Sequence, residues 1–388
     1  MARIARVATF MLAHNGVAGG VGTTSGEKDW LVIDTAINAL RRVQFDVSDT
    51  IRRVQGDVVG AFGLNPQESP HKIIMSHPYW RLRDYGGDDR SRYLLIIAAP
   101  IKRPYIWDLA PSISAIRFCL HQGLYVQLLE WMPASPNAGN CGLDEYVLAI
   151  SEAVATITTA AQGVMPSLIG HSLGGTLAAM YGALLPESIR SLVLLGAPLC
   201  FEPSENQFRD ALVTLVPQEI SDADPFPGSL LSHASALASP RAFIWSRLMD
   251  AAMSIGDPLA MAIHARVERW ALDEMPLPGK LVHQIIDWLY RENRFRSNKL
   301  KIGEKFIGPS TLSVPTLAVV NTADDVAPLN SLKPFADAMA KNVQIIEYTG
   351  ELGVCLQHLG ILVGRRAQAH VWPEILSWLK SQTSSMRA

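Results

Sequence analysis

A serine lies between two glycines in the stretch LIGHSLGGTLAAMYG, which covers residues 168–182. The motif Gly170-x-Ser172-x-Gly174 follows a run typical of a strand and opens a run of small residues typical of a helix. At such a sharp turn the serine hydroxyl projects above the sheet, and the flanking glycines permit the close packing that the turn requires. We therefore expect Ser172 to be a nucleophile for acyl transfer, and a buried or helix-capping serine is the alternative.

A serine hydroxyl is a weak nucleophile at neutral pH, so it needs a base and an acid that orients this base. Enzymes with this turn carry them in the order serine, acid, histidine. Two acids follow the predicted strand in PTLAVVNTADDVAPLNS; we favour Asp324 and keep Asp325 as the alternative, because one carboxylate would cap the next helix. His358 lies in a loop after the predicted strand NVQIIEYTG and is the expected base, whereas His370 lies inside a helical pattern.

The oxygen that becomes negative during acyl transfer needs backbone N–H donors, which form an oxyanion hole. Leu173 would provide one, because its amide follows the nucleophile at the start of a helix. The loop after YLLIIAA would provide another, and Ile101 is the candidate. His171 is adjacent to Ser172, and adjacent side chains at a sharp turn diverge, so His171 is not expected to be the base. We expect it to line the pocket instead. Lys102 and Arg103 have two interpretations, a site for an anionic substrate group and a solvated basic pair.

The elements that would hold these residues alternate between short apolar strands and helices. Strands are expected at 93–99, 124–131 and 190–196, with helical stretches between them. This alternation predicts an α/β fold with a mostly parallel sheet covered on both faces. Before it, HKIIMSHPYWRLRDY alternates in strand fashion and ends at GGDD, a hairpin-turn signal that precedes YLLIIAA and predicts a two-stranded opening to the sheet.

The alternation breaks between about 200 and 300, where the chain is helical and rich in aromatic residues. An insertion at this point normally lies over the carboxyl ends of the strands, where open α/β sheets bind ligands. Its apolar side chains would line an acyl pocket, although packing within the insertion also explains each aromatic residue. The expected organisation is an N-terminal helical extension at 1–68, a first part of the core at 69–199, a helical cap insertion at 200–300 and a second part of the core at 301–388.

Composition argues against several function classes. The net charge of −2 provides no broad positive field, so we expect no nucleic acid partner. No stretch of about 18 apolar residues is present, so we expect no transmembrane segment. The four cysteines are widely spaced without a CxxC pair, which suggests neither a disulfide framework nor a zinc site and fits a reducing cytoplasm. The start, MARIARVATFMLA, faintly resembles a targeting segment, and a helical extension is the expected alternative.

Several ordered blocks across roughly 70–380 resemble the polyhydroxyalkanoate (poly-3-hydroxybutyrate) synthases, among them GTLAAMYGALLPESIRSLVLLGAPLCF, LYRENRF and GILVGRRAQAHVWPEILSWL. The resemblance implies an α/β-hydrolase fold with a helical cap. It also implies that Ser172, Asp324 and His358 are nucleophile, acid and base. The synthases carry a cysteine in a G-x-C-x-G-G elbow, whereas this chain carries a serine, and DDVAP stands where the family tends to have DHIVP.

This difference bears on the acceptor of the acyl group. A cysteine thioester stays reactive toward the next hydroxyacyl unit, whereas a serine oxoester is the working species of esterases and lipases. We therefore predict a serine acyl hydrolase, an esterase, thioesterase or depolymerase, that acts on a hydroxyacyl or acyl ester or thioester, acyl-CoA included, with no metal and no organic cofactor. The alternatives are a synthase-type acyltransferase that uses acyl-CoA and a noncatalytic companion or granule-associated protein. Residues 1–65 could serve a homodimer contact or bind a granule.

Overall fold

The computed structural model describes residues 47–134, 140–216, 220–339 and 343–384, all within one compact unit that begins at Phe45. The part of the expected N-terminal extension that precedes residue 47 lies outside the described residues. A helix covers 47–59, and the π-helical turn η1 (Gly60–Leu64) continues it.

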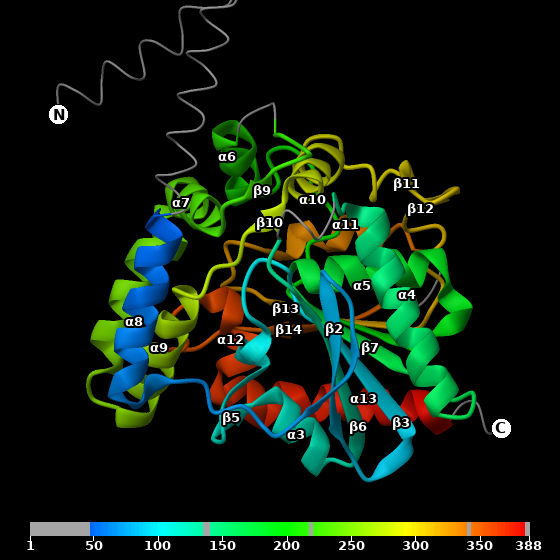
Figure 1. Ribbon diagram of the computed structural model, residues 1–388, viewed down its shortest axis with the longest axis horizontal. Coiled ribbons are helices and arrows are strands. Elements are labelled where there is room, and N and C mark those ends of the chain that lie inside the picture. Colours follow the sequence, from blue (N-terminus) through cyan, green and yellow to red (C-terminus); the bar gives the residue numbers. More distant parts are fainter. Residues whose placement is uncertain (1–46, 135–139, 217–219, 340–342, 385–388) are drawn as a thin grey trace, which may run out of the picture. The chain divides into compact units, whose positions relative to one another are not determined.

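Among the described residues, a sheet of eight strands forms the centre of this unit (Figure 1). The order is β1-β2-β6-β3-β7-β8-β13-β14; β2 is antiparallel to both of its neighbours, and every pair from β6 to β14 is parallel. Parallel strands are buried on both faces and are therefore apolar along much of their length. The bounds are β1 Lys72–Ser76, β2 Trp80–Gly86, β3 Asp89–Ile97, β6 Leu124–Trp131, β7 Ser167–His171, β8 Leu192–Leu195, β13 Thr316–Asn321 and β14 Val343–Tyr348.

Helices cover both faces of the sheet, as the alternating pattern predicted (Figure 1). Helices α4 and α5 pack together on one face. Helices α3 and α13 lie on the other, where the ring centroids of Phe118 and Trp372 are 6.1 Å apart. The α/β prediction is therefore confirmed. The bounds are α3 Ala115–His121, α4 Leu143–Ala160, α5 Leu173–Leu184, α11 Lys333–Ala336, α12 Gly360–Val363 and α13 Trp372–Ser384, with the short helices η2 Pro104–Trp107, η3 Pro186–Ser188, η6 Leu329–Ser331, η7 Gln357–Leu359 and η8 Ala367–Val371.

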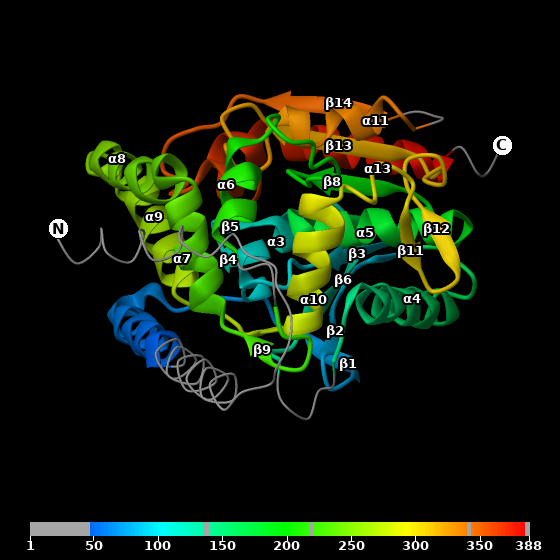
Figure 2. The same cartoon turned by 90° about the horizontal axis from the view of Figure 1, so that it is seen from above.

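The expected insertion consists mainly of helices that follow β8. Helices α7, α8 and α9 lie together at one end of the sheet, beside the helix over 47–59 (Figures 1 and 2). None of the helices in the described part of the chain combines the length and the apolar character needed to cross a membrane. The bounds are α6 Gln207–Leu215, α7 Gly228–Ala238, η4 Arg241–Trp245, α8 Ser246–Ser254, α9 Pro258–Ala271, α10 Gly279–Gln284 and η5 Ile285–Arg291; the short strand pairs are β4 Asp108–Ala110 with β5 Ile113–Ser114, β9 Pro225–Phe226 with β10 Leu277–Pro278, and β11 Leu300–Ile302 with β12 Lys305–Ile307.

One prediction about the sheet is wrong. The GGDD turn does join β2 to β3, but these strands do not pair with each other, because β6 lies between them. The two-stranded opening consists of β1 and β2 instead. A turn signal reports only that the chain reverses locally. It does not report which strands will pair with β3, and in the structure these are β6 and β7.

Candidate active site

Ser172 occupies the turn between β7 and α5. Its backbone has φ 54° and ψ −134°, a region that costs a residue with a side chain about 1–3 kcal/mol. The turn is tight, because a Cβ on Gly170 would lie 2.6 Å from backbone atoms of Gly174, and a Cβ on Gly174 would lie 2.3 Å from the carbonyl oxygen of Ile97. Only glycine fits at these two positions, and this close packing holds Ser172 in its strained conformation.

The Ser172 hydroxyl does not act as a helix cap. Its backbone amide donates to the Leu195 carbonyl at 3.0 Å, and within the described residues its side chain makes no capping hydrogen bond to α5. Leu173 is the first residue of α5, and amides at that position have no partner inside the helix. The capping alternative for Ser172 therefore does not apply, and the Leu173 amide is left without a partner inside α5.

His358 and Asp324 form a buried pair. His358 Nδ1 lies 2.6 Å from Asp324 Oδ2, and the two residues are 7% and 3% exposed. Asp324 Oδ1 also accepts from the Val326 amide at 2.8 Å. Burial alone would raise the pKa of Asp324, but the attraction and hydrogen bond of His358 and the backbone amides hold it below its usual value. The carboxylate is thus ionised at neutral pH and keeps the proton of the imidazole on Nδ1.

The second ring nitrogen of His358, Nε2, is buried and is left without a hydrogen-bond partner in the described part of the chain. Both His358 and Ser172 line one cavity, and catalytic hydrogen bonds are often unformed in the absence of substrate. An imidazole with its proton on Nδ1 and a bare Nε2 is prepared to take a proton from a hydroxyl group.

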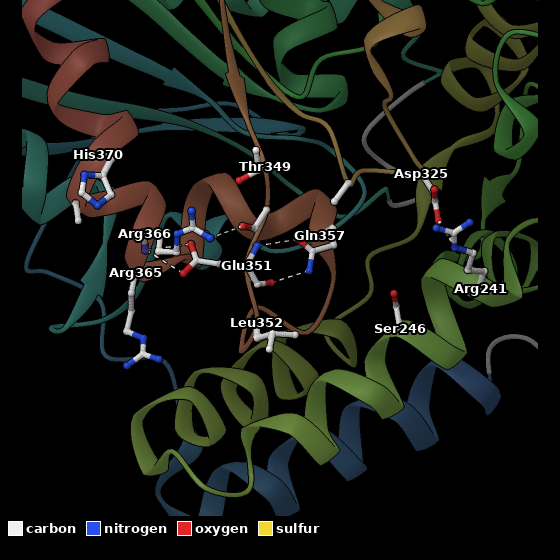
Figure 3. Close-up of a pocket in the computed structure, with 13 residues that line it drawn as sticks. Arg241, Ser246, Asp325, Thr349, Glu351, Leu352, Gln357, Arg365, Arg366 and His370 are labelled. Atoms are coloured by element: carbon white, nitrogen blue, oxygen red, sulfur yellow. Dashed lines mark hydrogen bonds and ion pairs between the residues drawn. The ribbon is translucent and has the colours of Figure 1, made fainter.

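Asp325 does not contact His358. Its side chain is 39% exposed and pairs with Arg241 Nε at 3.4 Å. Figure 3 shows that it faces a second pocket, which His370 and Gln357 also line. The structure therefore brings Asp324 to His358 and directs its neighbour away, because consecutive side chains diverge at the end of β13.

His171 binds the backbone of His358. Its Nε2 lies 2.8 Å from the His358 carbonyl oxygen and donates to it, and the two ring centroids are 4.6 Å apart. Burial, and to a smaller extent the nearby His358, lower the pKa of His171 to about 3. The ring is therefore neutral at neutral pH, and its donated hydrogen bond holds the backbone of His358.

The cavity above Ser172 has a volume of about 290 Å³. Ile101, His171, Leu173 and His358 line it together with Ser172, whereas Asp324 lies behind His358. Its other walls come largely from apolar side chains of the expected insertion, and such a lining suits an acyl chain. These insertion residues include Phe208, Leu212, Phe243, Val267, Trp270 and Leu277.

Lys102 connects the Ile101 loop to the insertion. Its Nζ donates to the Ala271 carbonyl at 2.6 Å and lies 3.4 Å from Glu274 Oε1. Trp270 Nε1 donates to the Arg103 carbonyl at 2.8 Å. Burial lowers the pKa of Lys102 to about 8, although Glu274 opposes this shift. Lys102 is therefore no solvated surface residue, and the sequence did not single out Glu274, because no motif marks it.

Comparisons with known proteins agree with the fold. A family model described as alpha/beta hydrolase fold matches residues 132–353. The chain is 26% identical over 332 residues to the poly(3-hydroxyalkanoate) polymerase subunit PhaC of Haloferax mediterranei, covering 82% of this chain and 65% of that protein. It is 24% identical over 357 residues to PhaC of Allochromatium vinosum, covering 90% of this chain and 99% of that protein.

The chain thus spans less than two thirds of the Haloferax mediterranei relative and nearly all of the Allochromatium vinosum relative. Two solved structures share the fold, each at a TM-score of 0.52. BpoC from Mycobacterium tuberculosis H37Rv is 17% identical and the match covers 81% of this chain and 99% of that chain. Rv0554 from Mycobacterium tuberculosis is 19% identical and the match covers 78% of this chain and 93% of that chain. The resemblance seen in the sequence blocks is confirmed by these relatives. The chain belongs to the alpha/beta hydrolase fold family, as an enzyme related to the poly(3-hydroxyalkanoate) polymerases.

Proposed function

We propose that this enzyme transfers an acyl group through an ester of Ser172, with His358 as base and Asp324 as the residue that orients it. One observation carries the proposal: His358 is bound through Nδ1 to a buried carboxylate, its Nε2 has no hydrogen-bond partner among the described residues, and His358 lines the same cavity as Ser172. This is the arrangement that makes a serine hydroxyl nucleophilic.

The steps follow from these atoms. Ser172 Oγ attacks the acyl carbonyl carbon while its proton passes to His358 Nε2. The carbonyl oxygen becomes negative, and the amides of Leu173 and Ile101 are the candidates to stabilise it. Collapse of this intermediate breaks the bond to the leaving group, which takes the proton from His358. Asp324 stabilises the transient imidazolium.

The acceptor that removes the acyl group from Ser172 distinguishes two candidate functions. Relatives named poly(3-hydroxyalkanoate) polymerase subunits favour the hydroxyl of another hydroxyacyl unit, with a hydroxyacyl thioester such as an acyl-CoA as donor. We take this polymerase-type transfer as the leading candidate. The serine at the nucleophile position favours water as the second candidate, because oxoesters are the intermediates of esterases. The apolar walls of the cavity support exclusion of water and hence transfer.

Product analysis tests the proposal. The full chain is incubated with a 3-hydroxyacyl-CoA, and Ser172→Ala serves as the control. Linked oligomers that are absent with Ser172→Ala would support transfer, whereas free hydroxy acid would support hydrolysis. Ser172→Cys is a matched variant, and the thioester it forms is expected to raise the ratio of oligomer to free acid.

A serine-directed fluorophosphonate probe separates both enzymes from a noncatalytic companion or granule-associated protein. The probe should label the wild type and leave Ser172→Ala unlabelled. The proposed function would be rejected if the wild type is not labelled and forms neither linked oligomers nor free hydroxy acid.

A further inference from the structure

A cluster of metal-binding side chains lies next to the loop that carries His358. His264 and Glu268 are one turn apart on α9, and the chain after β14 brings Cys355 to them. Cys355 Sγ is 3.1 Å from Glu268 Oε1, and His264 Nε2 is 3.7 Å from the same oxygen. One ligand atom from each residue lies within 4.8 Å of the other two. We propose that His264, Glu268 and Cys355 bind a divalent transition-metal cation of the zinc type.

The chemistry of the donors favours this class of cation. Thiolate sulfur, imidazole nitrogen and carboxylate oxygen are the ligands of zinc in proteins, and three protein ligands leave a fourth position for water or another group. Hard cations such as calcium and magnesium prefer sites made only of oxygen atoms. A sulfur and a nitrogen in a set of three therefore select against them.

Asp250 prepares the histidine for this role. Its Oδ2 lies 2.7 Å from His264 Nδ1, which therefore carries the proton and leaves a lone pair on Nε2, the atom that lies 3.7 Å from Glu268 Oε1. Asp250 also accepts from the amides of Gly353 and Cys355 at 2.7 and 2.8 Å. A carboxylate behind a ligating histidine is the usual outer shell of a metal site, and it both orients the ring and raises its basicity.

The charges of the cluster match a divalent cation. Arg247 also holds Glu268, with its Nε 2.8 Å from Oε1, the oxygen that lies near Cys355 and His264. Once the Cys355 thiol has lost its proton, the side chains of Asp250, Glu268 and Cys355 and the guanidinium of Arg247 carry a net charge of −2. A bound divalent cation brings the cluster to neutrality, which a largely buried site requires.

Binding exchanges a proton for the metal. Without metal the Cys355 S–H donates to Glu268 Oε1. The metal–sulfur bond forms as the S–H bond breaks, and the proton leaves to solvent. Glu268 is 36% exposed at its side chain while His264 is buried, so an ion can enter past the carboxylate.

Such a metal would act on the position of the base. Cys355 lies three residues before His358 and lines the same cavity, whereas His264 and Glu268 belong to the insertion. A bound ion would therefore join α9 to the loop of the base. The chemistry at Ser172 requires no metal, so this role is structural or regulatory.

Cobalt substitution tests the site in the full chain. The protein is treated with a chelator, dialysed and titrated with Co²⁺ alone, and a parallel sample is dialysed against Zn²⁺ for metal analysis. We expect one Zn²⁺ per chain and an absorption band from thiolate-to-cobalt charge transfer. Cys355→Ser should lose this band, although the serine hydroxyl still donates to Glu268. His264→Asn keeps a donor for Asp250 but removes the ligand, and should weaken Co²⁺ binding at least about tenfold.

The matched control is Cys119→Ala, which removes another buried cysteine and should keep the band. Absence of a thiolate band from the folded wild type, or its persistence in Cys355→Ser, would overturn the proposal. The wild-type spectrum decides even where a variant does not fold. These readouts do not depend on acyl transfer, so a failed product assay and a failed metal titration remain distinguishable.

Discussion

Proton control at His358 depends on single side chains. The Asp324 carboxylate can only accept, so it selects the tautomer that has its proton on Nδ1 and leaves Nε2 bare. His171, neutral and donating, fixes the backbone of the same residue. We make a separate prediction for each group. Asp324 sets the tautomer of His358, whereas His171 has a buried ring whose own protonation affects stability.

Asp324→Asn should lower kcat for Ser172-dependent turnover by about 10⁴-fold and change KM little. An amide can donate to Nδ1 and thereby stabilise the tautomer that cannot accept the serine proton. Steady-state kinetics on a chromogenic acyl ester would measure the effect. Asp325→Asn is the matched control, and a comparable loss from it would contradict the assignment of the acid, since Asp325 pairs with an exposed arginine.

Because the His171 ring is buried and neutral, we expect the folded protein to lose stability in mild acid. The pKa of its buried ring is about 3, whereas that of an unfolded histidine is about 6.5, so below pH 6.5 the unfolded chain binds a proton that the folded chain does not. The free energy of unfolding should therefore fall by about 1.4 kcal/mol per pH unit from this group as pH drops from 6.5 toward 3. His171→Gln keeps a donor for the His358 carbonyl and removes the titration.

Urea unfolding at pH 7 and pH 5 tests this prediction. The wild type should lose about 2 kcal/mol more than His171→Gln between the two values. Equal losses in both proteins would show that His171 is not a neutral buried group.

Elements far apart in the chain hold the loop after β3 in place. Glu274, at the end of the α9 segment, accepts from Lys102 on the loop after β3 and pairs with Arg52 Nη2 at 3.0 Å from the helix over 47–59. Glu274 Oε2 has no hydrogen-bond partner within the described residues, so its other oxygen makes both of these contacts. Three segments therefore meet at one buried carboxylate.

Glu274→Gln should reduce the free energy of unfolding by about 3 kcal/mol, because it leaves Lys102 buried without its counter-charge. The measurement is urea unfolding at neutral pH. Adding Lys102→Met to Glu274→Gln should recover part of the loss, since one of the two uncompensated charges is gone and only Arg52 remains. A change below about 0.5 kcal/mol in the single variant would mean that water compensates the lysine.

The whole molecule makes the substrate cavity, because neither the sheet nor the helical segment at 200–300 encloses it alone. Ser172 follows β7 and His358 lies in η7, whereas the apolar walls come from helices such as α6 and α9. Acyl selectivity is therefore expected to depend on residues that are remote from the triad in sequence.

Val267→Phe fills part of the cavity from α9. It should lower kcat/KM for long acyl chains about tenfold while largely sparing acetyl esters, because one added ring excludes a few methylene groups. A series of p-nitrophenyl esters would measure this. Ile263→Phe is the control, since this buried residue lies one turn earlier on α9 outside the cavity lining. Equal losses across chain lengths in Val267→Phe would indicate general overpacking instead.

Much of this architecture could be predicted from the sequence, because the signals are local. The alternation of apolar strands and helices predicted the α/β fold, and the glycines around Ser172 predicted the turn. The expected order of nucleophile, acid and base left two adjacent candidates for the acid, Asp324 and Asp325, and favoured His358 as the base. The roles of these residues stay predictions, although the structure brings His358 and Asp324 into contact.

The positions of strands, helices and the strained serine turn follow from local pattern, because the hydrophobic period and the need for glycine depend on neighbouring residues. Folding of the whole chain is what places β6 between β2 and β3, brings Asp324 rather than Asp325 to His358, and brings Cys355 to His264 and Glu268. Each of these depends on the direction of a side chain or on pairing across many residues. Local pattern does not encode such contacts, because packing of the whole chain selects them.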